Sequence, residues 1–226
     1  MAVTKSELRA GVRARRRSRT EAERSAAAIA LRDRVLALPI LSGAVSSVSP
    51  SAVVSRSHRA APEPVPARKV AAYVSGPDEP GTGPLIEGLL ATQLHVLVPV
   101  LLPDFDLDWG RVGSGSGRFA PSQVAGDGRL FEPDGPRLGP DAVGTTALVI
   151  VPALAVDRRG RRLGQGGGSY DRALGRIPAG IPIVALLFDD ELLDDIPVEA
   201  HDRAVHFAVT PTRTVGFGAG SAGSRL

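Results

Sequence analysis

The residues with the clearest chemical pattern lie in one stretch, Asp157–Arg172, which reads DRRGRRLGQGGGSYDR. Within it, two adjacent arginines, Arg161 and Arg162, are followed by four glycines: Gly164, Gly166, Gly167 and Gly168. Glycine lets backbone N–H groups approach an anion closely, and arginine neutralises its charge. Asp171 in the same stretch would repel phosphate unless a divalent cation lies between them. The stretch therefore indicates a loop that binds a polyphosphate together with a metal ion.

The loop fits neither of the two common phosphate-binding motifs. No Gly-Lys-Ser/Thr follows at P-loop spacing, and Ser169 stands where a dinucleotide fingerprint needs its third glycine. A flexible glycine turn is the alternative. Placement favours phosphate binding, because the loop follows the apolar run Leu148–Ala155 and enters a helical pattern. Ser169 is the expected N-cap of that helix, and Tyr170, Ala173, Leu174 and Ile177 are its expected inner face.

A second carboxylate suited to a metal is Asp202, in the segment PVEAHD at 197–202. Mg²⁺ takes one or two carboxylates and phosphate oxygens, so Asp171 and Asp202 together would suffice. The alternative is that PVEAHD is only a polar turn. His201 has no partner histidine at metal-binding spacing, so zinc has little support.

The N-terminal segment carries most of the positive charge. Residues 1–34 hold ten Lys or Arg against four Asp or Glu. Thr4 and Glu7 fit a capping box that predicts a helix to about Arg17, and Thr20 with Glu23 begins a second. The first helix places Lys5, Arg9 and Arg13 on one face. That face is directed either at solvent or at phosphate, and the spacing of the three residues does not distinguish these two alternatives. Nucleic acid is not expected, because no aromatic residues interleave with these arginines.

Alternating strands and helices must position these groups. Val70–Ser75 and His95–Leu101 read as strands flanking a helix at Leu85–Leu94. Further strands are expected at Thr145–Val151, Ile183–Phe188 and Ala204–Thr210. This order predicts an α/β fold: a three-layer, mostly parallel, Rossmann-like sheet with helices on both faces. Ligands gather at the carboxyl ends of such strands, which places Asp78 and Glu79 of the loop Gly76–Pro84 near the ligand.

Composition narrows the class of protein. The chain has 226 residues and no cysteine, which excludes disulfides, thiolate metal sites and cysteine nucleophiles. No apolar run is long enough to span a membrane and no secretory signal is visible, so a cytoplasmic location is expected. We also expect a monomer. We expect one domain over residues 1–215, with a flexible insertion at 42–69 and a disordered tail at 216–226. Trp109 falls in the loop-rich region 102–144, where packing is the more common role for tryptophan.

Several of these segments together resemble the 5-formyltetrahydrofolate cyclo-ligases, also called 5,10-methenyltetrahydrofolate synthetases. The segments that carry the resemblance are Lys5-x-x-Leu8-Arg9, Tyr73–Thr82, the run VPALAVDRRGRRLGQGGGSYDR at 151–172, and PVEAHD at 197–202. They occur in the family's order and roughly its spacing. The resemblance covers most of the chain apart from residues 42–69 and the tail.

The resemblance implies an ATP- and Mg²⁺-dependent cyclisation of a folate. The formyl oxygen of 5-formyltetrahydrofolate attacks the γ-phosphate of ATP, and the folate's N10 then displaces phosphate to give 5,10-methenyltetrahydrofolate, ADP and phosphate. Such a reaction needs positioning and charge neutralisation rather than a protein nucleophile. This agrees with a chain that has no cysteine and no Ser–His pairing.

The resemblance also implies roles for individual residues. Those expected to bind ATP are Lys5, Arg9, Arg162, Leu163, Gly164, Gln165, Gly166, Gly167, Gly168, Ser169, Tyr170 and Asp171. Those expected to bind the folate are Val74, Glu79, Trp109, Gly166, Gly167, Gly168, Ser169 and Tyr170. Asp171 and Asp202 would bind Mg²⁺, while Arg162 and Tyr170 would act on the reacting groups. A carboxylate such as Glu79 can accept paired hydrogen bonds from the amino-pyrimidine end of the pterin.

The chain departs from the family pattern at Gln165, where a basic or aromatic residue is common, and at Ser169, where an aromatic residue is usual. Because of these two departures, two alternatives to the cyclo-ligase remain. The protein could be a degenerate member of the family that binds folate or nucleotide without turnover, or it could act on another formamide substrate.

Overall fold

The computed structural model describes residues 4–41, 68–113, 133, 135–197 and 203–218. Its centre is a seven-stranded sheet in the order β10-β9-β7-β4-β1-β2-β3. The strands are β1 (Lys69–Ala71), β2 (His95–Leu101), β3 (Leu107–Arg111), β4 (Leu148–Pro152), β7 (Ile183–Leu186), β9 (Phe207–Val209) and β10 (Thr214–Gly216). The five inner strands are parallel, while β3 and β10 pair antiparallel at the two edges. The predicted fold class is confirmed.

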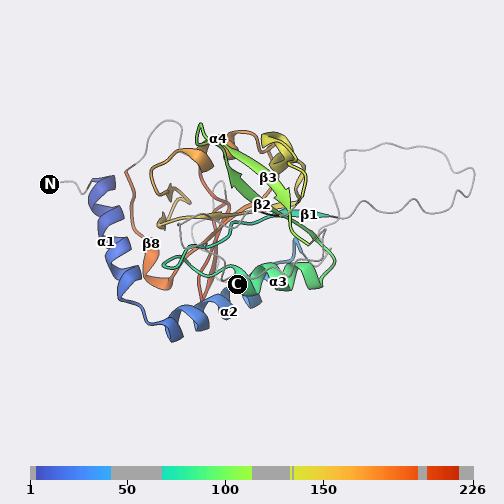
Figure 1. Ribbon diagram of the computed structural model, residues 1–226. Coiled ribbons are helices and arrows are strands. Elements are labelled where there is room, and N and C mark those ends of the chain that lie inside the picture. Colours follow the sequence, from blue (N-terminus) through green and yellow to red (C-terminus); the bar gives the residue numbers. More distant parts are fainter. Residues whose placement is uncertain (1–3, 42–67, 114–132, 134, 198–202, 219–226) are drawn as a thin grey trace, which may run out of the picture.

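Helices cover both faces of this sheet, as Figure 1 shows. On one face lie α2 (Glu21–Leu36) and α3 (Gly83–Ala91); on the other lie α4 (Ser169–Gly175) and the 3-10 helix η1 (Pro140–Thr145). Alternate residues of β4 divide between the two cores, with Leu148 and Ile150 facing α2 and α3, and Val149 and Val151 facing α4. A strand buried on both faces explains the unbroken apolar run in the sequence.

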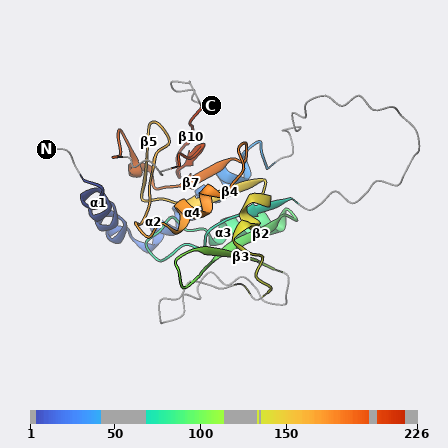
Figure 2. The same cartoon turned by 90° about the horizontal axis from the view of Figure 1, so that it is seen from above.

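A second, smaller sheet carries the N-terminal helix. It consists of β6 (Arg162–Leu163), β5 (Ala155–Asp157) and β8 (Leu192–Leu193), and the 3-10 helix η2 (Asp189–Glu191) leads into β8. Helix α1 (Lys5–Ser18) packs Val12 and Leu8 against Leu154 and Leu163 of this layer. Seen from above in Figure 2, α1 lies at the margin of the molecule, beside the small sheet and away from α3.

Several predicted boundaries are corrected by the structure. The first strand is shorter than Val70–Ser75, and α3 ends before Leu94. The region 102–144 is not all loop, since it contains β3 and η1. The small sheet and β10 were not predicted, because strands of two or three residues carry no periodicity of their own. Of the predicted insertion and tail, residues 42–67 and 219–226 lie outside the described residues.

Within the described ranges, no helix has the length and apolar character needed to cross a membrane.

Candidate functional site

The glycine loop connects β6 to α4 beside the carboxyl end of β4. Gly166 and Gly168 have φ of +104° and +73°, a backbone region that favours glycine. A Cβ at Gly166 would lie 3.5 Å from Cζ of Arg9, and one at Gly168 would lie 3.2 Å from Nη1 of Arg172. Gly168, not Ser169, is the N-cap of α4, so the predicted cap is wrong by one residue. The glycines therefore let arginines approach the loop backbone closely.

Arginines from α1 and β6 contact this loop. Arg9 donates from Nε to the carbonyl of Gly164 at 3.0 Å. Arg13 donates from Nη2 to the Gln165 carbonyl at 3.0 Å, and from Nε and Nη2 to Gln165 Oε1 at 3.2 and 2.8 Å. Arg9 and Arg13 of the basic face of α1 are thus directed at the glycine loop, while the binding of phosphate by this face stays a prediction.

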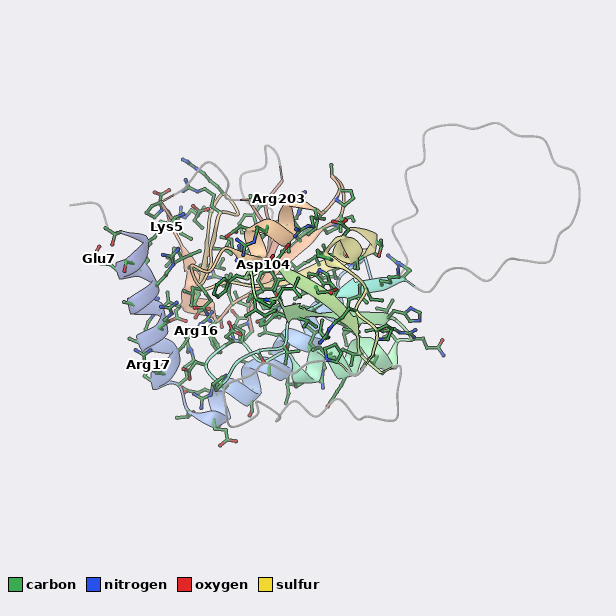
Figure 3. The ribbon with its side chains drawn as sticks, turned by 45° about the horizontal axis from the view of Figure 1, so that its top comes forward. Lys5, Glu7, Arg16, Arg17, Asp104 and Arg203 are labelled. Atoms are coloured by element: carbon green, nitrogen blue, oxygen red, sulfur yellow. The ribbon has the colours of Figure 1, made fainter. Side chains whose placement is uncertain are left out.

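Lys5 lies half-buried one turn before Arg9 on the same helix, and Figure 3 marks it near the amino end of α1. The helix is held by Arg16, whose side chain is 2% exposed. Arg16 donates to Glu191 Oε1 and Oε2 at 2.7 and 2.8 Å, and to the carbonyl of Ala153 at 2.6 Å. Burial opposes the charge, but the hydrogen bond and charge of Glu191 outweigh it and raise the pKa of Arg16. This buried ion pair fixes the position of Arg9 and Arg13.

The two arginines of the loop motif have different partners. Arg161 pairs with the fully buried Asp157 and with Asp195, so it braces the small sheet and is not directed at the glycine loop. Arg162 is buried, donates to the carbonyl of Pro152 at 3.2 Å and pairs with Asp171. The side chain of Asp171 is 27% exposed, so it contacts Arg162 and is still partly open to solvent. Only the second arginine is therefore placed at the loop.

Glu79 lies in the turn after β1 and reaches the glycine loop. Its Oε2 accepts from the N–H of Gly76 at 2.9 Å, and its Oε1 accepts from Nε2 of Gln165 at 3.2 Å. Reciprocal hydrogen bonds of 3.0 Å between Ser75 and Thr82 close the same turn. Val74 is half-buried at its start and packs on the α2–α3 core. The nucleotide-side and folate-side residues expected from the sequence therefore meet at Gln165.

Tyr170 lies between the two cores, and its hydroxyl is buried without a partner among the described residues. Burial, and secondarily the charge of Glu79, raises the pKa of Tyr170 above its ordinary value. The hydroxyl therefore remains protonated at neutral pH and can donate a hydrogen bond but not accept a proton. Nε of Arg162 is likewise buried and unpaired within the described part of the chain. Buried polar atoms without a partner are few in folded proteins; Nε of Arg19 and Nε1 of Trp109 are further examples among the described residues.

Replacing Tyr170 by phenylalanine should stabilise the free protein while lowering its activity. The change removes a buried unpaired hydroxyl, which costs about 1–3 kcal/mol while it lacks a partner. Thermal denaturation without ligand should show a raised Tm, and steady-state assays should show a lower kcat. Unchanged activity would mean that the hydroxyl makes no contact with a ligand.

One expected residue, Trp109, is not brought to this site. Trp109 is 1% exposed in the core under α4, where it serves packing, and contact with a folate stays a prediction. Asp202 lies outside the described residues. Across the ranges that are described, no three His, Cys, Asp or Glu side chains gather in a way that could hold a metal. The metal prediction therefore depends on Asp171.

Sequence reasoning missed Glu191 as the partner of Arg16 and missed the pairing of Arg13 with Gln165. Arg13 was visible on the basic face of the first helix, but its partner lies 152 positions away. Glu191 was visible only as part of an acidic segment. Neither pairing has a local signal, because each depends on how α1 docks.

Comparisons with known proteins agree with this architecture. The model of the 5-formyltetrahydrofolate cyclo-ligase family matches residues 1–211. A 5-formyltetrahydrofolate cyclo-ligase of Mycolicibacterium smegmatis is 37% identical over 94% of this chain and 96% of its own length. The Escherichia coli K12 enzyme of the same name is 31% identical over 67% of this chain and 82% of its own.

The fold is also similar to a solved structure, that of Aquifex aeolicus 5,10-methenyltetrahydrofolate synthetase. It matches with a TM-score of 0.68 at 22% identity, covering 98% of this chain and 96% of that one. The family match, the near full-length relative and the shared fold lead to one conclusion: the chain belongs to the 5-formyltetrahydrofolate cyclo-ligase family.

Proposed function

We propose that this protein converts 5-formyltetrahydrofolate to 5,10-methenyltetrahydrofolate with ATP and Mg²⁺, releasing ADP and phosphate. One observation supports this most directly. Gln165 lies in the arginine-lined glycine loop and donates a hydrogen bond to Glu79, a carboxylate that could bind the folate. That arrangement brings a polyphosphate and a second ligand within reach of each other, as phosphoryl transfer requires.

The nucleotide phosphates would lie against Gly164–Gly168, with Lys5, Arg9 and Arg162 neutralising their charge. Arg9 and Arg162 are held by carbonyl oxygens, of Gly164 and Pro152, which leave further guanidinium N–H groups for phosphate. Fixed guanidinium groups stabilise charge that develops on the transferred phosphoryl group without needing to reorganise. Leu163, Ser169 and Tyr170 would border this ligand.

Asp171 fits a magnesium ion at this place. It lies in the first turn of α4, directly after the loop, and its side chain is partly exposed. One carboxylate can serve, because Mg²⁺ keeps several waters and takes its remaining ligands from phosphate. Bound there, Mg²⁺ would neutralise phosphate charge, with Asp202 as the proposed second carboxylate. Arg162, paired with Asp171, would orient that carboxylate.

On the substrate side, Glu79 would accept hydrogen bonds from the amino-pyrimidine end of the pterin, and Val74 would pack beside it. The protonated hydroxyl of Tyr170 would donate to the folate or to the transferring phosphoryl group. The formyl oxygen would attack the γ-phosphate, and N10 would then attack the formyl carbon and expel phosphate. The protein supplies positioning and charge in both steps.

The direct test supplies the purified protein with 5-formyltetrahydrofolate and MgATP, and follows the near-ultraviolet absorbance of the methenyl product. Product formation that requires both ATP and Mg²⁺ is the expected result. Calorimetric binding of both ligands without ATP consumption would instead identify a binding protein without turnover. Failure to bind a reduced folate would contradict the proposal.

Glu79→Gln should raise the KM for the folate about ten- to a hundredfold and leave the KM for ATP nearly unchanged. The change removes one charge-assisted acceptor, worth about 1.5–3 kcal/mol, and keeps the side-chain shape. Steady-state kinetics with each substrate varied in turn gives the comparison. Glu87→Gln, the same substitution at an exposed position of α3, is the matched control and should change neither constant. Equal loss toward both substrates would rule out a folate-side role for Glu79.

A further inference from the structure

Both polar atoms of the Gln165 side-chain amide form hydrogen bonds, which connect the expected nucleotide side of the site with the expected folate side. Its Oε1 accepts from Arg13 at 2.8 and 3.2 Å, and its Nε2 donates to Glu79 Oε1 at 3.2 Å. Its backbone carbonyl accepts from Arg13 at 3.0 Å as well. The side chain is exposed and lies between Gly164 and Gly166, so packing does not hold it there. Hydrogen bonds alone therefore determine its position.

These contacts leave Glu79 with a donor on each carboxylate oxygen. Gly76 N–H occupies Oε2 at 2.9 Å, and Gln165 occupies Oε1. Each carboxylate oxygen has a second lone pair, but the Gln165 amide occupies the side of Oε1 that faces the glycine loop, so a ligand that donates to this carboxylate from that side must displace it. The contact between Gln165 and Glu79 therefore competes with the substrate.

Arg13 connects this competition to the nucleotide. It projects from α1 one turn after Arg9, over the same loop, and its partners are neutral oxygens of Gln165. A guanidinium binds phosphate more strongly than it binds a neutral amide, and it prefers a two-pronged contact. A polyphosphate on the loop would draw Arg13 away from Gln165 Oε1 and release the amide.

We propose that Arg13 is a further contact to the nucleotide phosphates, and that Gln165 is a positioning residue that couples nucleotide binding to the freeing of Glu79. This inference rests on the proposed function. Nucleotide binding then strengthens substrate binding, and by linkage the substrate strengthens nucleotide binding by the same factor. One exposed hydrogen bond must be broken, so the coupling is about three- to tenfold.

Calorimetric titration of 5-formyltetrahydrofolate, with and without a non-hydrolysable ATP analogue and Mg²⁺, tests this coupling. In the unsubstituted protein the Kd for the folate should fall about three- to tenfold when the analogue is present. Gln165→Ala should bind the folate about three- to tenfold more tightly without nucleotide and gain nothing further from it. In a Glu79→Ala background, which removes the acceptor of the Gln165 amide, the alanine substitution at Gln165 should have no effect on the remaining folate affinity.

Arg13 is tested by its effect on ATP. Arg13→Ala should raise the KM for ATP and abolish the coupling. Arg13→Lys keeps the charge but loses the paired N–H donors of the guanidinium, so it should restore the KM only in part. Arg17→Ala removes the same charge from the same helix, and Arg17, marked in Figure 3, is exposed. It should behave like the unsubstituted protein.

Different outcomes would contradict the proposed function and the roles of Gln165 and Arg13. If the unsubstituted protein neither binds nor converts the folate, the proposed function is wrong. If it does both, but Gln165→Ala shows unchanged folate affinity and unchanged coupling, the role of Gln165 is overturned. If Arg13→Ala leaves the KM for ATP unchanged, Arg13 does not contact the phosphates.

Discussion

Replacing Asp171 by asparagine should lower the MgATP-dependent kcat by a hundredfold or more. A metal ion that neutralises phosphate charge contributes several kcal/mol to catalysis, and a neutral amide holds Mg²⁺ far less well than a carboxylate. Asparagine keeps the shape and one acceptor for Arg162, which is buried and pairs with Asp171. Initial rates over a range of Mg²⁺ concentrations should show a higher metal requirement as well as a lower maximum.

The loss of charge beside Arg162 should also lower stability, so the kinetic result needs a matched control. Asp106→Asn breaks a comparable pair, in which Arg176 donates to Asp106 at 2.6 and 2.9 Å away from the glycine loop. It should lower the Tm and preserve the response to Mg²⁺. If both variants lost the same fraction of activity, the effect of Asp171 would be one of stability and the metal assignment would be wrong.

Local signals made most of the fold predictable from the sequence. Thr4 with Glu7 and Thr20 with Glu23 form the expected capping boxes, because both partners lie within one turn. The inner strands β2, β4 and β7 were visible as apolar runs, because parallel strands are buried on both faces. The small sheet was not visible, since β6 and β8 have two residues each and exist only through pairing with β5.

Several residues that the structure brings together were expected at one site, but how they contact one another was not predicted. The glycine loop was identified from residue type and placement, and Arg9, Arg162 and Glu79 were expected beside it from the family resemblance. Which arginine faces the loop was not predicted, because Arg161 directly precedes the two-residue strand β6 that begins at Arg162, and successive residues of an extended chain point to opposite sides. The partner of Glu79 depended on the docking of two loops 86 positions apart. Neither segment contains a local pattern that indicates a contact with the other.

The docking of α1 determines whether this site exists at all. Arg9 and Arg13 both come from α1, whose buried contacts with the rest of the protein are a small apolar cluster around Val12 and the pair Arg16–Glu191. Glu191 also accepts from the N–H of Phe188 at 3.0 Å, and the Phe188 ring lies under Arg19, 4.1 Å from its Cζ. A change that breaks the pair should therefore affect both stability and nucleotide binding.

Glu191→Ala should cost about 3–5 kcal/mol, since it leaves the Arg16 guanidinium buried without its counter-charge. For a chain of this length, that cost corresponds to a fall in Tm of roughly 6–20 °C. Arg15→Ala, which breaks the exposed pair with Asp190, is the control and should cost no more than about 1 kcal/mol. Differential scanning calorimetry measures both.

Since α1 carries Arg9 and Arg13, Glu191→Ala should also raise the KM for ATP at temperatures where the protein is still folded, and Arg15→Ala should not. Equal stability of the two variants would mean that α1 is held by its apolar face alone.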